Sequence, residues 1–150
     1  MIIDRVVRSM IPTVTAEDPS ISAGSVELKS ETDIPTKTYF MDLEEKRISG
    51  LTDGKIAMRQ AIFKILQSER FVYSKIYSDN YGSELWDLIG MPMAWVLSEV
   101  QRRITEALTW DKRITSVTDF EFSRNGESLL VGFVAHTIFG TVSSEVEVAI

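Results

Sequence analysis

The chain has 150 residues, a length that suits one domain with an extension, because typical domains contain about 100–150 residues. A hydrophobic fraction of 44% and a charged fraction of 25% are those of an ordinary globular protein, and no apolar run approaches the ~20 residues that cross a bilayer. The net charge of −6 argues against a nucleic-acid partner, since such proteins neutralise phosphates with clustered Lys and Arg. Cysteine is absent and His136 is the single histidine, so we expect no zinc site, no other metal and no cofactor.

The first part of the chain has the composition of an extension. Apolar residues recur at helical spacing over 2–11 and stop at Pro12, which predicts a short amphipathic helix. Residues 13–36 are rich in Ser, Thr, Pro, Gly and acids and show no sustained period, which is typical of an extended arm. We therefore expect an N-terminal arm over 1–35 and one domain over 36–150.

A hairpin and a helix are predicted next. The runs "TKTYFMDL" and "KRISGL" flank a polar turn and indicate two paired strands, with Tyr39 and Met41 on one face. Asp53 precedes a helical pattern over about 54–69, where its carboxylate is suited to the N-cap position. One stripe of that helix is expected in the core: Met58, Ala61, Ile62, Ile65 and Leu66.

The middle of the chain contains an aromatic run and a second long helix. "RFVYSKIY", residues 70–77, predicts a strand, followed by a turn and a short helix over about 82–89. Gly90 and Pro92 separate this from a longer helix, since glycine favours helix ends and proline a first turn. The inner face of the longer helix is predicted to comprise Leu97, Val100, Ile104, Ala107 and Leu108.

The last third predicts a strand hairpin and an edge strand. Asn125-Gly126 is a hairpin-turn signal, and the run over 128–140 is apolar on both faces, as in a central strand covered on both sides. In "TVSSEVEVAI", residues 141–150, Glu145 and Glu147 alternate with Val142, Ser144, Val146 and Val148, a pattern typical of an edge strand. The predicted fold class is α+β, a small, mostly antiparallel sheet with two or three helices packed on it.

Two patterns suggest catalysis. Glu84 and Asp87 stand at i and i+3, so their side chains start about 5–6 Å apart on a helix, and retaining glycosidases separate their two carboxyl groups by about that distance. Acid pairs at this spacing are also common on solvated helix faces. His136 lies within an apolar strand without the motif of a catalytic triad, which favours a hydrogen-bonded sheet histidine.

Asp111 follows the longer helix, where helix-end carbonyls and the helix dipole disfavour negative charge. It therefore needs a cationic partner, and Arg113 or Arg70 could supply a guanidinium. Two interpretations remain open: a clasp between helix and strand that stabilises only this domain, or a joint that docks a partner.

Several motifs, in this order, resemble the baseplate wedge family of contractile phage tails, in the form found in PBSX-like phages and phage-tail-like bacteriocins. They are "AIFKILQSER", "YGSEL", "LIG", "EVQRRITEALTWDKRI" and "VGFVAHTIFG", and the likeness covers about 36–148. The Glu-Pro-Arg signature of the wider family matches Asp111, Lys112 and Arg113, with lysine in place of proline. Its Phe-Gly-Ser step matches Tyr81, Gly82 and Ser83, and its Glu-Arg step matches Glu69 and Arg70.

The resemblance implies a structural protein rather than an enzyme. Such a protein joins the larger wedge proteins around the central spike hub or tube-initiator proteins and connects the baseplate to the first sheath ring. It assembles in the host cytoplasm and ends in the baseplate of a virion or tail-like particle. The family is thought to offer a strand edge to sheath, which we assign to residues 141–150. The expected partner-binding residues are Asp111, Arg113, Trp110, Glu69, Arg70, Tyr81, Gly82, Val142, Ser144, Val146 and Val148. The alternatives are a small peptidoglycan-degrading enzyme using Glu84 and Asp87, and a free-standing binding module.

Overall fold

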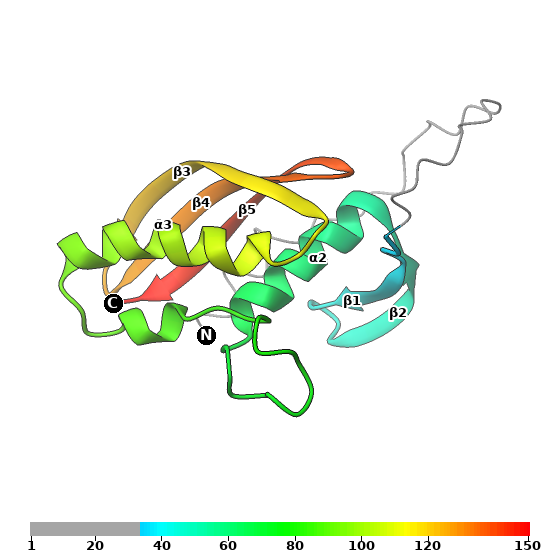
Figure 1. Cartoon of the computed structure of the whole chain (residues 1–150), viewed down its shortest axis with the longest axis horizontal. Helices are drawn as coiled ribbons and strands as arrows, with labels where there is room; N and C mark the ends of the chain where they lie inside the picture. Colours follow the sequence, from blue (N-terminus) through cyan, green and yellow to red (C-terminus); the bar gives the residue numbers. More distant parts are fainter. Residues whose placement is uncertain (1–33) are drawn as a thin grey trace.

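A computed structural model of the protein describes residues 34–150, which form an α+β fold, as predicted (Figure 1). The predicted arm and its helix over 2–11 lie outside the described residues, apart from the last two residues of the arm. The elements are, in chain order, β1 (Thr38–Asp42), β2 (Arg47–Thr52), α2 (Gly54–Gln67), the 3₁₀ helix η1 (Leu85–Leu88), α3 (Met93–Thr109), β3 (Ile114–Asn125), β4 (Ser128–Thr137) and β5 (Gly140–Ala149).

Three strands form the main antiparallel sheet in the order β3-β4-β5, and both α-helices pack on one face of it. The shared core lies between that face and the helices, and its fully buried side chains come from both: Met58, Ile62, Leu88, Val100, Ile104, Leu108, Val131 and Val146. Every core-facing residue of β4 and β5 is buried. The single layer of helices therefore covers most of the apolar surface that the sheet removes from water.

Strand β4 is central, as predicted, but the prediction that it is covered on both faces is wrong. Leu129, Val131, Phe133 and Ala135 are buried, whereas the alternating residues on the other face are partly exposed. Within the described residues no helix covers that outer face. The outer face of β4 carries Leu130, Gly132, Val134 and His136, all of them partly exposed.

The β3–β4 turn lies one residue later than Asn125-Gly126 predicts. Asn125 pairs with Ser128, so the two loop residues are Gly126 and Glu127, and Gly126 has a φ of 63°. This places glycine at the first loop position, where a type II′ turn requires positive φ.

Helix α2 begins after Asp53, as predicted. The Asp53 carboxylate accepts hydrogen bonds from the Thr36 hydroxyl and, at 2.7 Å, from the Gly54 backbone N–H. These two hydrogen bonds, of which the one from Thr36 has the larger effect, hold the pKa of the Asp53 carboxyl below its ordinary value. The helix ends at Gln67 rather than residue 69, because Ser68 has extended backbone angles and its N–H closes the last turn on the Lys64 carbonyl.

The predicted first hairpin is present, but it forms a separate two-stranded sheet. Gln60, which is 4% exposed on α2, attaches it to the domain. Its Nε2 donates to the Tyr39 carbonyl at 2.7 Å and its Oε1 accepts from the Met41 N–H at 3.0 Å. Because one amide side chain satisfies two strand groups, β1 is held on α2 without extending the main sheet.

Helix α3 has the predicted amphipathic pattern with one error. Val100, Ile104, Ala107 and Leu108 are buried, but Leu97 is exposed and Val96 occupies the core instead. Val96 stands four residues before Val100, which stands four residues before Ile104, so the inner face runs through Val96 rather than Leu97. No helix within residues 34–150 is long and apolar enough to cross a membrane.

The strand predicted over 70–77 is wrong. Residues 71–77 form consecutive turns with all their residues exposed, and Phe71 has a φ of 71°, which interrupts any extended strand. The predicted helix over 82–89 is reduced to η1, four residues long. The loop returns to the domain at a parallel bridge between Glu69 and Ser83.

Gly82 closes the base of this loop. A Cβ there would lie 2.7 Å from the Ser68 carbonyl oxygen, and its φ is 101°. The Ser83 backbone N–H donates to the same Ser68 oxygen at 2.8 Å, and the Ser83 hydroxyl donates to the Leu66 carbonyl at 2.9 Å. Glycine is therefore required by both space and backbone conformation.

Replacing Gly82 by alanine tests this close approach, with Gly90→Ala as the matched control. Gly90 also has positive φ, 78°, but open space where a Cβ would stand. We expect Gly90→Ala to lower the free energy of unfolding by about 1 kcal/mol through backbone strain alone, and Gly82→Ala by roughly 3 kcal/mol because a backbone clash adds to strain. Urea unfolding measures both, and equal losses would contradict the packing argument.

Candidate partner-binding site

The helix-to-strand junction after α3 is built on Asp111 and Arg113. Arg113 Nε donates to Asp111 Oδ1 at 2.9 Å and Arg113 Nη2 to Oδ2 at 2.6 Å, a bidentate ion pair. The Arg113 backbone N–H also donates to Oδ1 at 3.0 Å. The Asp111 carboxylate thus stabilises the turn between α3 and β3. Arg113, two residues further on, is the cationic partner that Asp111 was expected to need.

Charge on Asp111 is maintained against partial burial. Desolvation opposes ionisation, but the hydrogen bonds from the Arg113 guanidinium and backbone outweigh it, so the pKa of Asp111 lies below its ordinary value. The same ion pair raises the pKa of Arg113. Trp110, at the helix end beside this pair, is 54% exposed, so its ring is available to a partner.

Arg70, the other predicted partner of Asp111, pairs elsewhere. Its side chain is 7% exposed, and Nη1 donates to Glu106 at 2.8 Å and to Glu84 at 3.3 Å. Nε and Nη2 both donate to the Gly82 carbonyl. Arg70 therefore joins the loop base to α3. Its hydrogen bond to Glu106 is the largest of the effects that lower the pKa of Glu106. A partner has little access to its guanidinium.

The remaining predicted residues of this region divide by exposure. Glu69 is exposed beside the loop base, while Gly82 is buried in it. Tyr81 is half-buried, and its ring stacks on Tyr77 with centroids 4.3 Å apart. Burial is the largest of several effects on the Tyr81 phenol, and it raises the pKa of Tyr81 above its ordinary value. Tyr81 lines a small pocket together with Asp111 and Arg113, so the fold brings Tyr81 to an ion pair that lies far from it in the sequence.

Strand β5 is an edge strand, as predicted. Val142, Ser144, Val146 and Val148 are all buried, between 2% and 4% exposed, in the core of the domain itself. Their side chains cannot contact a partner directly, so pairing at this edge has to use the backbone. The Ser144 hydroxyl finds no hydrogen-bond partner in the part of the chain that the structure describes, and it interrupts the valine stripe.

The backbone register shows which groups face outward from β5. Ile150 N–H donates to the Glu127 carbonyl, and the pairing continues without a shift from Ser128↔Ala149 to Thr137↔Gly140. In an antiparallel ladder, hydrogen-bonded pairs alternate with pairs whose N–H and C=O groups point to the other side. The outward set is therefore Thr141, Ser143, Glu145, Glu147 and Ala149.

The residues considered for catalysis are not brought together as an active site. Glu84 pairs with Arg70 at 3.3 Å, and Asp87, 69% exposed, lies 3.6 Å from Arg103. Neither lines either of the two pockets described in this section. His136 Nε2 lies 2.8 Å from the Thr118 hydroxyl, as a hydrogen-bonded sheet histidine would. Glu84 and Asp87 thus each contact an arginine, and His136 is hydrogen-bonded within the sheet.

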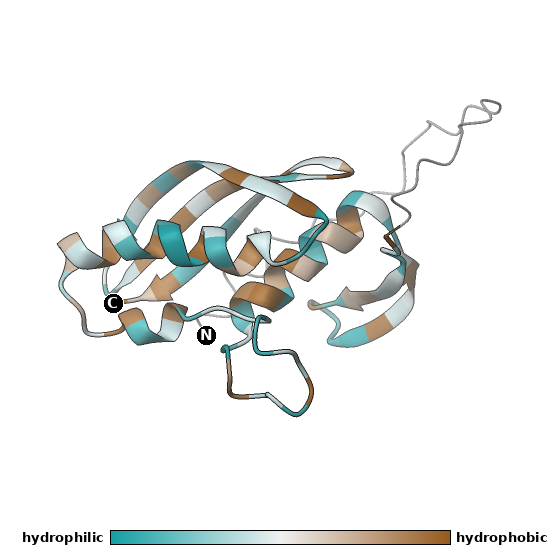
Figure 2. Ribbon diagram, viewed as in Figure 1, coloured by the Kyte–Doolittle hydropathy of each residue, from teal (hydrophilic) through white to brown (hydrophobic). Residues whose placement is uncertain are grey.

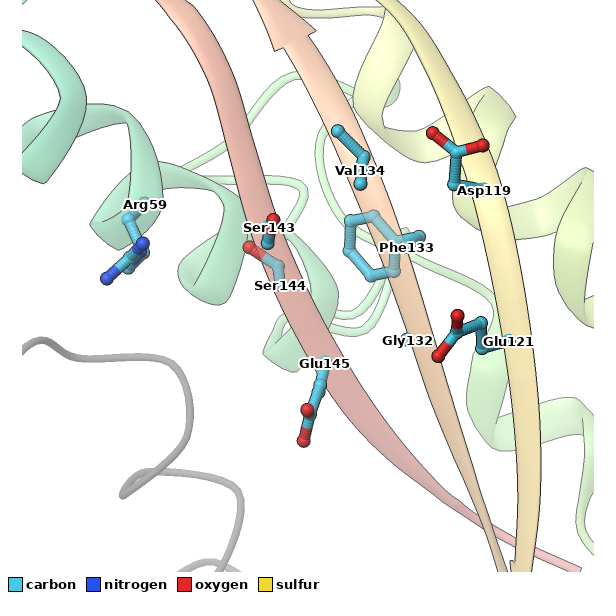
Figure 3. A pocket seen from close by; sticks show the side chains of 9 residues that line it. All are labelled: Arg59, Asp119, Glu121, Gly132, Phe133, Val134, Ser143, Ser144 and Glu145. Carbon is cyan, nitrogen blue, oxygen red and sulfur yellow. The ribbon is translucent and has the colours of Figure 1, made fainter.

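The second pocket, about 380 Å³, lies on the outer face of the main sheet (Figure 3). It exists because Gly132 has no side chain and β3 carries a bulge there, with Asp119 at a φ of 54°. Figure 3 shows acidic side chains from β3 and β5 around it and Arg59 coming from α2. Among the described residues, no group of three or more His, Cys, Asp or Glu side chains is arranged so that it could hold a metal ion.

Comparison with known proteins shows the family to which the chain belongs. Residues 31–140 match the family described as contractile injection system sheath initiator. The chain is 40% identical over 131 residues to phage-like element PBSX protein XkdS of Bacillus subtilis (strain 168), a match that covers 85% of this chain and 92% of that protein. The chain belongs to the sheath-initiator family. The resemblance to a PBSX-type baseplate family is confirmed.

Membership in the sheath-initiator family identifies the chain as a structural, sheath-initiating component of a contractile tail. The matched region contains the Asp111–Arg113 pair, the Arg70 contacts and the small pocket, and it ends at Gly140, where β5 begins. Sequence reasoning missed two residues that position this region, Gln60 and Glu106. The sequence shows only that both residues lie on predicted helices. It does not indicate that Gln60 contacts a distant backbone or that Glu106 contacts a distant guanidinium.

The Asp111–Arg113 pair predicts a specific pH dependence. Since the pKa of Asp111 is lowered in the folded state, its stabilisation is present above the ordinary value of about 3.9 and is lost as pH falls through the folded pKa. We expect Asp111→Asn to lower the free energy of unfolding by about 1 kcal/mol at pH 7, a figure reduced for partial exposure, with the difference shrinking below about pH 4.

Urea unfolding of both proteins between pH 7 and pH 3 measures this difference. Asp87→Asn is the control, because Asp87 is exposed and its contact is long, so its variant should follow the wild type throughout. A constant difference between wild type and Asp111→Asn at all pH values would show that the carboxylate acts through shape rather than charge.

Arg70→Ala tests the buried guanidinium against Arg102→Ala, since both arginines pair with Glu106. Arg70 is buried and satisfies the Gly82 carbonyl, so its loss should lower the free energy of unfolding by about 2–3 kcal/mol. The Arg102 side chain is 54% exposed, so solvent screens its ion pair and its loss should change stability far less than the loss of Arg70. Chemical denaturation provides the measurement, and similar losses would remove the structural role from Arg70.

Proposed function

We propose that this sheath-initiator protein begins the sheath by lending the free edge of β5 to an extended segment of the first sheath subunit. The observation that carries this proposal is the edge itself: ten residues of β5 pair on one side with β4 and with no other described strand. The incoming strand would be recognised through main-chain hydrogen bonds, as in other cases of strand addition.

The side chains of β5 suit such a reserved edge. Its buried stripe fixes the register of the strand, because a slip of one residue would move the valines into solvent. On the outer face, Glu147 accepts a hydrogen bond from the Ser128 hydroxyl, and Glu145 stands two residues before it. Two carboxylates beside the edge discourage pairing with an arbitrary strand, so the edge stays open until a fitting partner arrives.

The other attachment of the protein is to the baseplate. We assign it to the surface around the Asp111–Arg113 pair, where Trp110 is exposed and a pocket is available. This pair leads into β3, which is the edge of the main sheet opposite β5. Wedge proteins and central hub or tube-initiator proteins would thus bind one side and sheath the other. Assembly would take place in the host cytoplasm, with the finished protein in the particle's baseplate.

Ser143→Pro tests the edge directly. Ser143 is one of the outward residues, so proline removes an N–H that β4 does not use, at a position where edge strands tolerate it. Particles carrying Ser143→Pro should contain complete baseplates but at least tenfold less sheath, as counted by electron microscopy. The control Ser143→Ala keeps the N–H and should assemble normally.

A wild-type amount of sheath on Ser143→Pro baseplates would refute strand lending at β5. Circular dichroism and urea unfolding of the purified variant verify that the domain remains folded. Deleting 141–150 is a poorer test, because it removes three valines from the core and would unfold the domain.

A further inference from the structure

The small pocket beside the Asp111–Arg113 pair has the size of one side chain. It encloses about 180 Å³ between β1, α2 and the start of β3, less than the ~300 Å³ or more of sites that hold small molecules. Ala57, Ala61 and Ile65 contribute apolar lining and Tyr81 an aromatic ring. The polar and charged lining residues are Thr36, Thr38, Gln60, Lys64, Asp111 and Arg113.

Two cationic groups in this pocket have unused capacity. Arg113 donates to Asp111 through Nε and Nη2, which leaves Nη1 without an acceptor among the described residues. Lys64 forms no ion pair within residues 34–150. Asp111, the single acid of the pocket, is already neutralised by Arg113. The pocket therefore carries an excess positive charge in a chain of net charge −6.

An apolar surface continues from the pocket. Tyr81, which lines the pocket, stacks on Tyr77 of the loop over 71–77. That loop exposes five large side chains by 41–75%: Phe71, Val72, Tyr73, Ile76 and Tyr77. Figure 2 shows hydrophobic residues on this loop, which projects away from both sheets. Such a cluster of exposed aromatic and apolar residues is typical of protein interfaces. The loop contains one lysine in a chain of negative net charge, so it has little electrostatic attraction for an anionic lipid surface.

We propose that this pocket receives an aspartate or glutamate side chain of a neighbouring baseplate protein, on a segment whose apolar residues cover the loop over 71–77. Lys64 and Arg113 Nη1 bind the carboxylate, and the tyrosine stack carries the contact from the pocket to the loop. This deepens the proposed function and rests on it, since the partner belongs to the same baseplate. The partner's carboxylate and Asp111 then both bind Arg113. The Asp111–Arg113 pair would thus have both of the roles that the sequence left open, because it stabilises its own domain and binds a partner.

Carbodiimide treatment of assembled particles tests the contact, because the reagent joins a carboxylate to an amine that touches it. Mass spectrometry of the digested particles should find Lys64 linked to an acidic residue of another baseplate protein. Lys112 is the internal control: it lies beside the same ion pair, is exposed and does not line the pocket, so it should form no such link at comparable yield. Particles that contain the chain but yield no Lys64 link to a foreign carboxylate would overturn the proposal.

Variants provide an independent measurement. Lys64→Gln should reduce incorporation of the chain into baseplates at least tenfold, Lys64→Arg should restore it, and Lys112→Gln should leave it unchanged, with the folding of each checked by urea unfolding. Normal incorporation of Lys64→Gln would refute the pocket while leaving sheath initiation intact. Failure of the β5 edge appears differently, as normal baseplates without sheath, and absence of the chain from particles would refute both proposals.

Discussion

The buried guanidinium of Arg70 holds together the part of the domain that has the least regular structure. Between the end of α2 and the start of α3 the chain runs for 25 residues, over 68–92, and its only helix is the four-residue η1. Arg70 binds the Gly82 carbonyl across this excursion and Glu106 on α3. A buried charge is costly unless its partners surround it, so the loop base, η1 and α3 are constrained to one arrangement. The exposed apolar loop over 71–77 can project from the domain because its base is fixed in this way.

The two proposed interaction surfaces differ in the groups that they offer to a partner. One layer of helices covers the inner face of the main sheet and buries the inward side chains of β5, so at its edge the strand offers backbone groups, flanked by outer-face side chains such as Glu145 and Glu147. The Asp111–Arg113 pair instead presents side-chain chemistry: a guanidinium with one nitrogen unused, beside a lysine and a tyrosine stack. Backbone pairing suits a repeating partner, and a charged pocket suits a specific neighbour. The proposed function uses both kinds of recognition, one for the sheath and one for the baseplate.

Local patterns predicted the elements whose structure depends on near neighbours. The cap at Asp53, the inner stripe of α2, the edge position of β5 and the ion pair between Asp111 and Arg113 all involve residues within a few positions of one another, or a period that one face imposes. The strand predicted over 70–77 is wrong, because the β-favouring residues of this run are exposed and lie in turns instead of pairing with another strand. The prediction for Leu97 is wrong because Leu97 and Val96 stand three and four residues before Val100, so both fit the helical period and only packing selects Val96.

By itself the sequence determined the α+β class, the order of nearly all the elements and the family resemblance, because these follow from hydrophobic period, turn residues and ordered motifs. Tertiary structure alone decided that Arg70 pairs with Glu106 and Glu84 rather than Asp111, and that Gln60 carries the first hairpin. It also brought Lys64, Tyr81 and Arg113 around one pocket. Such contacts join residues 14 to 49 positions apart, and no local pattern specifies which distant group will satisfy a buried donor.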